Sequence, residues 1–308
     1  MISTIVVPLD GSALAARAVP FAVHLAARTK GELVLLRATQ HVNPVFVPHP
    51  EALVAAASHE QVAQREAAAD RWELAQSLRD QELVVHVALA AGVPELAILD
   101  AVRTRPASLI VMATHGEGGL GRMIYGSAAV EVLRHTPVPV LLVPAACDHR
   151  WPEMGPLRVL VPLDGSALAE TILDPIGALT GVLNIELHIL RVVPTVGRKA
   201  SATRDIAQTY RELARRRLAA LSISASTHIV IGDPAESIDT VARRLEVDVI
   251  AMATHGRTGL ARVVLGSVAE QTLHRARVPL LLVRPPLDRL VSESPADSGI
   301  TPAESRPA

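Results

Sequence analysis

The chain carries the same sequence pattern twice, and this internal repeat restricts the possible folds more than any other feature. Residues 7–15, VPLDGSALA, recur without change 154 residues later as residues 161–169. Residues 112–116, MATHG, recur 140 residues later as residues 252–256. The smaller offset of the second motif places a longer insert in the first copy, around residues 41–60. The sequence therefore predicts a duplicated domain.

Each copy alternates short apolar stretches with longer helical patterns. In the first copy we expect strands at 4–8, 33–38, 83–89, 109–113 and 138–143. We expect helices at 13–29, with Gly31 placed to terminate it, and at 50–80, 94–104 and 126–136. Hydrophobic residues make up 49% of the chain and aromatic residues only 2%, so the core must consist of Ala, Val, Leu and Ile. The predicted fold class is α/β, with two Rossmann-like domains, each a five-stranded, mainly parallel sheet with helices on both faces.

The predicted boundaries are a first domain at 1–145, a linker at 146–155, a second domain at 156–285 and a disordered tail at 286–308. The last strand of each copy is fully apolar and begins beside a proline, which suits the edge of a sheet. Exposed apolar edges invite aggregation. We therefore expect the two edges to meet across a pseudo-two-fold axis and join the copies. The alternative is burial of each strand under helices.

Composition excludes several classes of protein. The net charge of −1 gives no basic surface for nucleic acid. The lone Cys147 excludes an intramolecular disulfide framework and a cysteine-based zinc cluster. No stretch approaches the roughly 20 apolar residues that span a bilayer, and no secretory leader pattern is present, so we expect a cytoplasmic protein without a membrane partner. The histidines, among them His24, His86 and His228, lack the spacing of metal ligands.

A glycine-rich segment follows the fourth strand of each copy. It reads Ala-Thr-His-Gly, nine further residues and then Gly-Ser, where the last helix begins. Ligands of open parallel sheets bind at the carboxyl ends of the strands, and the free amides of a helix start favour a phosphate. The alternative is that these glycines only turn the chain and that Ser127 and Ser267 are ordinary N-caps.

Other polar residues accompany this segment. Asp10 and Asp164 follow the first strand of each copy, within reach of a ribose hydroxyl or a base, or alternatively as caps of the next helix. His115 and His255, with Arg122 and Arg262, lie beside the predicted phosphates or alternatively point to water. No Ser-His-Asp order or paired carboxylates indicate a committed catalyst.

Taken together, four motifs resemble the universal stress protein family over nearly all of residues 1–285. They are Pro-Leu-Asp-Gly-Ser, a Gly-x-Pro turn (Gly92 and Gly232), Ala-Thr-His-Gly with its spacer, and an apolar strand of the type Val-Pro-Val-Leu-Leu-Val. The resemblance implies a Rossmann-like fold. In the subclass with the pattern G-x-x-G-x9-G-[ST], it also implies ATP binding. This chain departs from that pattern at the first glycine, which is replaced by Ala113 and Ala253.

The resemblance implies one nucleotide site in each copy, with the aspartate near ribose and adenine and the end of the second strand offering backbone hydrogen bonds to adenine. The glycine segment would hold the phosphates. The implied residues are Asp10, Ala38, Ala113, Gly116, Gly126, Ser127 and Ala128 in copy one, and Asp164, Val192, Ala253, Gly256, Gly266, Ser267 and Val268 in copy two.

The implied function is an ATP-binding regulator in stress response or growth arrest, with Mg²⁺ arriving on the nucleotide and an unidentified regulatory protein as partner. Two alternatives stay open, a nucleotide-independent interaction module and a slow ATP hydrolase. The domains are expected to pair within the chain, and further pairing into a homodimer is left open.

Overall fold

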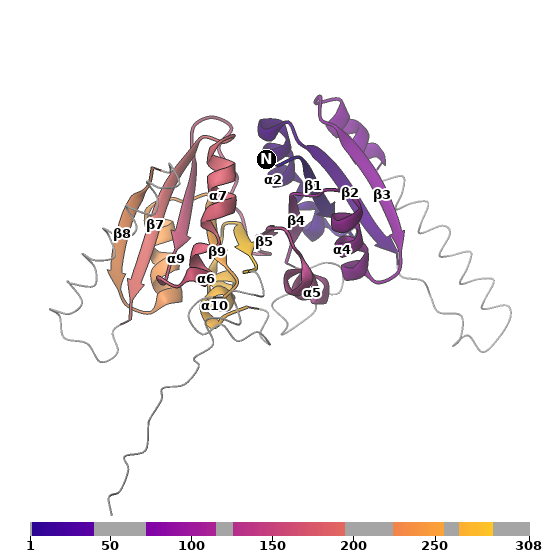
Figure 1. Cartoon of the computed structure of the whole chain (residues 1–308). Helices are drawn as coiled ribbons and strands as arrows, with labels where there is room; N and C mark the ends of the chain where they lie inside the picture. The colour runs from indigo at the N-terminus through magenta and orange to yellow at the C-terminus, as the bar shows by residue number, and fades with distance from the viewer. Residues whose placement is uncertain (1, 40–71, 115–125, 195–223, 256–264, 286–308) are drawn as a thin grey trace, which may run out of the picture.

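The computed structural model describes residues 2–39, 72–114, 126–194, 224–255 and 265–285 (Figure 1). The strands of these described residues form one ten-stranded sheet in the order β3-β2-β1-β4-β5-β10-β9-β6-β7-β8. Their bounds are β1 Thr4–Pro8, β2 Glu32–Thr39, β3 Val85–Ala91, β4 Leu109–Ala113, β5 Val140–Val143, β6 Leu157–Pro162, β7 Ile185–Val193, β8 Ser226–Ile231, β9 Val249–Ala253 and β10 Leu280–Val283.

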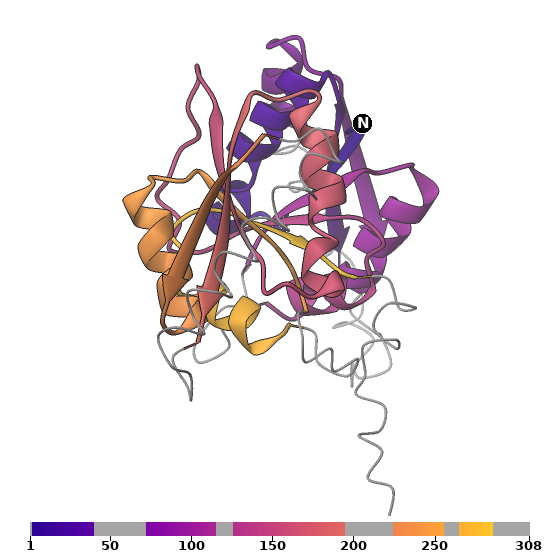
Figure 2. The ribbon, with the colours of Figure 1, turned by 60° about the vertical axis from the view of Figure 1, so that its left-hand side comes forward.

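Within each half the five strands are parallel, which confirms the predicted fold class. The halves are joined where β5 pairs with β10 in antiparallel fashion, with Leu141 opposite Leu281. The two apolar strands placed at sheet edges by the sequence thus meet each other, as expected. Figures 1 and 2 show the two halves lying on either side of this central pair.

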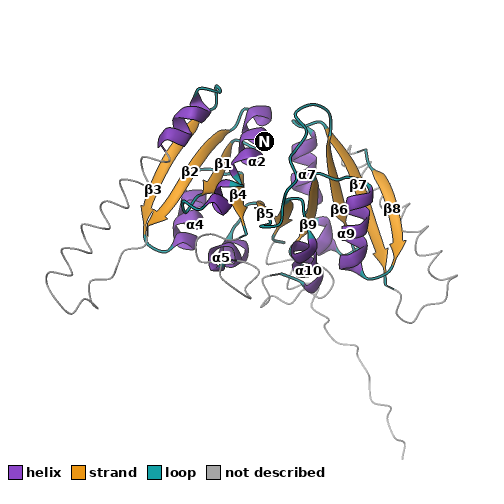
Figure 3. Cartoon of the chain, turned by 180° about the vertical axis from the view of Figure 1, so that it is seen from behind, coloured by secondary structure: helices purple, strands orange, loops and turns teal. Residues whose placement is uncertain are grey.

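Helices cover both faces of the sheet (Figure 3). Their bounds are α1 Ala13–Ala16, α2 Val19–Thr29, α4 Pro94–Thr104, α5 Ser127–His135, α6 Ala167–Glu170, α7 Leu173–Thr180, α9 Pro234–Arg244 and α10 Ser267–Arg275. Alternate strand residues face opposite sides, so Ile5 packs in the core with α2 and α7, whereas Val6 packs in the core with α4, α5, α9 and α10. No helix among the described residues is long and apolar enough to cross a membrane.

The expected helix at 13–29 is in fact two helices, because Pro20 lies in the first turn of α2. Proline has no backbone N–H, and its ring clashes with the carbonyl four residues earlier, so the helix breaks before it. The left-handed residue that ends α2 is Lys30, with φ 55°, and not Gly31, whose N–H donates to the carbonyl of Ala26. Of the expected helix at 50–80 only residues 72–79 are described and helical, and the expected tail at 286–308 lies outside the described residues.

The linker packs into the junction between the halves. Trp151 is buried and makes edge-on contacts with the rings of Phe21 and His24 on α2, at centroid distances of 5.0 and 5.3 Å. Its indole N–H donates to the backbone carbonyl of Asp248 in the second half, at 3.0 Å. One linker side chain therefore contacts both halves of the molecule.

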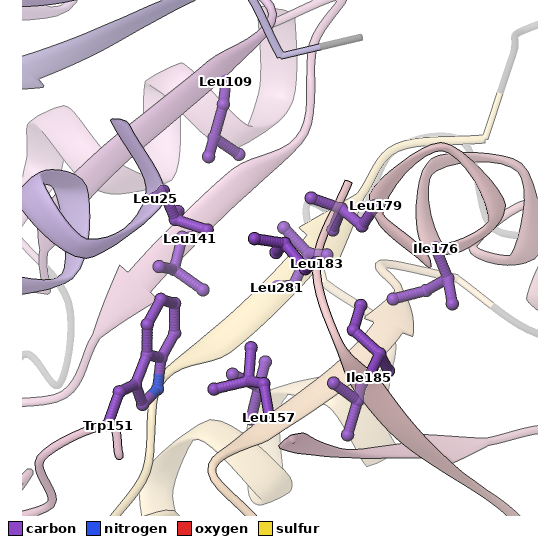
Figure 4. A pocket seen from close by; sticks show the side chains of 12 residues that line it. Leu25, Leu109, Leu141, Trp151, Leu157, Ile176, Leu179, Leu183, Ile185 and Leu281 are labelled. Carbon is purple, nitrogen blue, oxygen red and sulfur yellow. The ribbon is translucent and has the colours of Figure 1, made fainter. Parts of the chain in front are cut away.

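A small void of about 20 Å³ lies at this junction (Figure 4). Only hydrophobic side chains line it, including Leu25 and Leu141 from the first half and Ile176 and Leu281 from the second. A void this small and apolar offers no polar partner for water. It is part of a common core that binds the two halves together.

We expect Leu281→Ala to destabilise the whole chain by about 2–5 kcal/mol, since it enlarges a void that rigid strands on both sides prevent from collapsing. The free energy of unfolding from urea denaturation measures this effect. Leu96→Ala is the control, because Leu96 is 63% exposed. A loss at Leu281 no larger than at Leu96 would contradict a tightly packed junction.

Candidate functional site

The strand order places a topological switch point at the carboxyl ends of β1 and β4. The chain passes from β1 to β2 on one side of β1, whereas β4 lies on the other side and is followed by β5 still further out. The connections after β1 and after β4 therefore run in opposite directions along the sheet. The second half repeats the arrangement at β6 and β9. Such a switch point is where open parallel sheets bind ligands.

The turn after β1 holds Asp10 in a fixed geometry. Its Oδ1 accepts hydrogen bonds from the N–H of Ser12 at 2.9 Å and from the Ser12 hydroxyl at 2.7 Å. Ser12 in turn accepts from the N–H of Ala15, so the N-cap of α1 is Ser12. The interpretation of Asp10 as the helix cap is therefore wrong. Asp164 and Ser166 repeat the geometry at 2.9 and 2.6 Å, with Ser166 as the cap of α6.

The helices that follow the glycine-rich segments begin without a side-chain cap. The N-cap residues are Gly126 and Gly266, which have no side chain to cap the helix, and no side-chain cap bond is found at either start among the described residues. Ser127 and Ser267 are the first helical residues, so the interpretation of these serines as N-caps is wrong. Amides at a helix start that lacks such a cap are available to an anion.

Each of these glycines closes against the end of the neighbouring strand. The N–H of Gly126 donates to Thr114 O at 2.6 Å, and that of Gly266 to Thr254 O at 2.7 Å. A Cβ at Gly266 would stand 3.3 Å from the Thr254 oxygen. This contact is tight, so a side chain there would require the helix start or the end of β9 to shift by a few tenths of an ångström, and glycine allows the close approach without that shift.

The parallel register brings the aspartate turn level with this closure. Val6 on β1 pairs with Ile110 on β4. Asp10 and Thr114 each follow their paired residue by four positions, so they lie at the same height along the two strands. Leu160 pairs with Ile250, which places Asp164 and Thr254 in the same relation. The structure thus places the Asp10 or Asp164 turn and the following helix start level with each other at the same end of the sheet in each half.

The backbone of Ala38 faces the same switch point. Leu36 accepts a hydrogen bond from Leu9 at 2.8 Å, so its backbone groups face β1. Alternate residues of a strand face the same neighbour. Ala38 therefore directs its N–H and C=O to that side, beyond the last residue of β1. In the second half the carbonyl of Leu190 accepts a hydrogen bond from the N–H of Leu163 at 2.9 Å, so the backbone groups of Val192 point the same way. This direction fits the predicted contact with an adenine edge.

The remaining predicted residues divide into described and undescribed positions. Ala113 and Ala253 end β4 and β9 and are buried, and Ala128 and Val268 are the second residues of α5 and α10. His255 is 7% exposed, and its Nδ1 lies 3.0 Å from the Thr254 hydroxyl, so the alternative of an exposed turn histidine is wrong there. Gly116, Gly256, His115, Arg122 and Arg262 lie outside the described residues.

An arginine that the sequence analysis missed supports each aspartate turn. Gly11, with φ +97°, has the Arg37 guanidinium so close that a Cβ would stand 2.6 Å from its Nη1. In the second half Arg191 donates from Nη1 to the carbonyl of Leu163 at 3.2 Å. The two arginines are 154 residues apart, the same offset as the Asp-Gly-Ser motif. This recurrence in the sequence could have identified them as partners of the aspartate turns.

The sequence profile of the universal stress protein family matches residues 1–144 and again residues 157–284. The chain belongs to this family. A universal stress protein of Mycobacterium tuberculosis is 28% identical over 216 residues, which cover 67% of this chain and 70% of that protein. Universal stress protein E of Escherichia coli is 28% identical over 209 residues, which cover 62% of this chain and 65% of that protein.

The crystal structure of a universal stress protein from Archaeoglobus fulgidus shares the fold, with a TM-score of 0.65 and 21% identity. The match covers 94% of this chain and 98% of that one.

This universal stress protein has a histidine pair in its second half that its first half lacks. His188 on β7 and His228 on β8 face each other with 3.3 Å between Nδ1 and Nε2. The corresponding residues of the first half are Val34 and Ala88. Among the described residues, no group of three or more histidine, cysteine or acidic side chains is placed to hold a metal ion. The pair is a titratable contact between β7 and β8.

Burial is the main reason that the pKa of both histidines lies below its usual value. Glu186, with its Oε1 at 3.4 Å from His188, raises the pKa of His188 but does not offset burial, and Arg158 lowers it further. The pKa of His228 is lowered by burial, by His188 and by Arg244. The folded state therefore binds fewer protons than the unfolded state below pH 6.5, the unperturbed pKa.

We expect the stability that these histidines contribute to be complete above pH 6.5 and to be lost progressively as the pH falls below it. The double variant His188→Val, His228→Ala introduces the residues of the first half. It should flatten this part of the dependence of stability on pH. The free energy of unfolding at pH 8 and pH 5.5, compared between the two proteins, tests it. Equal losses in both would contradict the assignment to this pair.

Proposed function

We propose that this protein binds one adenine nucleotide, ATP, in each half and acts as a nucleotide-dependent regulator in stress response or growth arrest. The observation that carries the proposal is the arrangement at each switch point, where a helix start without a side-chain cap lies level with a rigidly held aspartate. The same arrangement occurs twice in the chain, with the same residues at Asp-Gly-Ser and Gly-Ser.

Each group has a separate task in this proposal. The helix-start amides, aided by the helix dipole, attract the phosphates, and the Ser127 and Ser267 hydroxyls donate to phosphate oxygens. The aspartate accepts hydrogen bonds from the ribose hydroxyls. Backbone groups of Ala38 and Val192 bind the adenine edge. Mg²⁺ would come with the nucleotide, held by its phosphates.

Regulation requires that the nucleotide binds two conformations or two complexes of the protein with different affinity. Since the bound phosphates would lie between the strand ends and the following helix, occupancy would alter the surface offered at these ends to a protein partner. Mass spectrometry of gently denatured, purified protein identifies any nucleotide that copurifies. Calorimetry with ATP and Mg²⁺ should give two sites per chain, and an absence of both ligand and heat would refute the proposal.

We expect Gly266→Glu to abolish binding at its own site and leave one nucleotide per chain, because a bulky anionic side chain enters the phosphate position. Gly126→Glu should do the same in the first half, so each half is the control for the other. Calorimetric stoichiometry measures both variants, with circular dichroism to verify the fold. A stoichiometry of two in either variant would disprove the phosphate assignment.

Asp164→Asn separates the structural role of this aspartate from its role in binding. Asparagine keeps an Oδ1 that accepts from Ser166, so the turn should persist, but it replaces the second carboxylate oxygen with a donor. We expect roughly tenfold weaker binding at this site, since a hydrogen bond to a charged group contributes about 1.5 kcal/mol or more. Unchanged ATP affinity would assign Asp164 a purely structural role.

A further inference from the structure

The second half contains a groove at the end of the sheet opposite the proposed nucleotide site. Its volume is about 490 Å³, within the size range of small-molecule sites. Helix α9, the turn at 246–248, the loop at 276–278, the linker residue His149 and the start of β6 form its walls. Asp248 directly precedes β9 and Arg158 belongs to the start of β6, so the groove lies at the amino ends of these strands.

The groove has charged walls and little exposed apolar surface. Val247, Ile250 and Ala276 close its bottom but are at most 3% exposed, and among its apolar lining residues Val278 is partly exposed. Arg158, Arg243 and Arg277 supply positive charge, with acidic side chains among them. Charged and titratable side chains predominate in the lining, so the groove suits a charged ligand with a small apolar part.

The two copies of the repeat differ sharply at these positions, although their nucleotide motifs are the same. Five charged residues of the groove occupy positions that are uncharged in the first half. Arg158, Asp239, Glu246, Asp248 and Arg277 correspond to Thr4, Leu99, Pro106, Ser108 and Pro137. Since the first half forms the same fold without these charges, the fold does not require them.

One wall of the groove is held rigidly. The Asp248 side chain is buried and uses both carboxylate oxygens. Its Oδ1 lies 2.7 Å from His149 Nε2, and its Oδ2 accepts a hydrogen bond from the backbone N–H of Arg158 at 2.7 Å. The indole of Trp151 donates to the Asp248 carbonyl. These bonds tie the linker to the start of β6 and β9, so the groove is formed before any ligand arrives, which lowers the entropic cost of binding.

Among the described residues, the charges of the walls leave one cation available. Arg243 is paired with Asp239 at 2.9 Å, and Arg158 is shared between Glu186 at 3.5 Å and Glu246 at 3.4 Å. Arg277 is exposed and makes no hydrogen bond or ion pair within the described part of the chain. A guanidinium in this position matches the two oxygens of a carboxylate or phosphate.

We propose that this groove binds a small organic oxyanion, a carboxylate or phosphate monoester, whose charged group contacts Arg277 and whose apolar part packs against the partly exposed Val278. The site is independent of the proposed nucleotide site. It gives the second half a ligand that the first half does not share.

Calorimetric titration of the full chain with benzoate and, separately, with phenyl phosphate tests the proposal. We expect one saturable site per chain for the better of the two probes, and which probe binds tighter identifies the anionic group. Inorganic phosphate alone should bind several-fold more weakly, because it makes no apolar contact with Val278. Arg277→Gln should weaken probe binding at least tenfold.

Arg103→Gln is the matched control, because Arg103 is exposed and occupies in the first half the position of Arg243 in the second. It should leave the affinity unchanged. Arg277→Pro, which installs the residue of the first half, should abolish binding while the fold persists. Absence of a saturable site, or equal affinity in Arg277→Gln, overturns the proposal. The double variant Gly126→Glu, Gly266→Glu should still bind the probe, which separates this site from the proposed nucleotide sites.

Discussion

The antiparallel pairing of β5 with β10 is the contact on which the rest of the molecule depends. Both strands are short, apolar and buried, and each would otherwise leave an unpaired apolar edge in water. Pairing satisfies their backbone groups and merges two five-stranded sheets into one. It also creates the shared core beneath, where α2, α7 and Trp151 pack around residues of both halves. The duplication therefore produces one continuous structure from two repeats.

The linker strengthens this union and adds a feature of its own. Trp151 packs on α2 of the first half and hydrogen-bonds to Asp248 of the second, while His149 contacts the Asp248 carboxylate. A segment that only has to connect two domains would not need buried aromatic and charged partners. Here the same contacts that fix the halves together also shape the wall of the proposed oxyanion groove.

The two halves keep one end of the sheet alike and differ at the other. At the carboxyl ends, the Asp-Gly-Ser turn and the Gly-Ser helix start have the same hydrogen bonds in both copies. At the amino ends, the second half has charged residues where the first has Leu, Pro, Ser and Thr, and its outer strands carry a histidine pair. This pattern fits two equivalent nucleotide sites combined with properties that belong to the second half alone.

The sequence by itself determined the duplication, the α/β class and the Asp-Gly-Ser turns at the carboxyl ends of β1 and β6, since these follow from local periodicity and from turn chemistry that favours glycine. Helix α4 and strand β4 have the bounds that the pattern at 94–104 and 109–113 predicted. The tertiary structure alone decided that Gly126 and not Ser127 caps α5, that His255 is buried, and that Arg37 lies beneath Gly11. It also decided the partners of Asp248 and His188. The reason is physical: these features depend on contacts between segments far apart in the chain, and no local pattern records which distant residues the pairing of strands brings together.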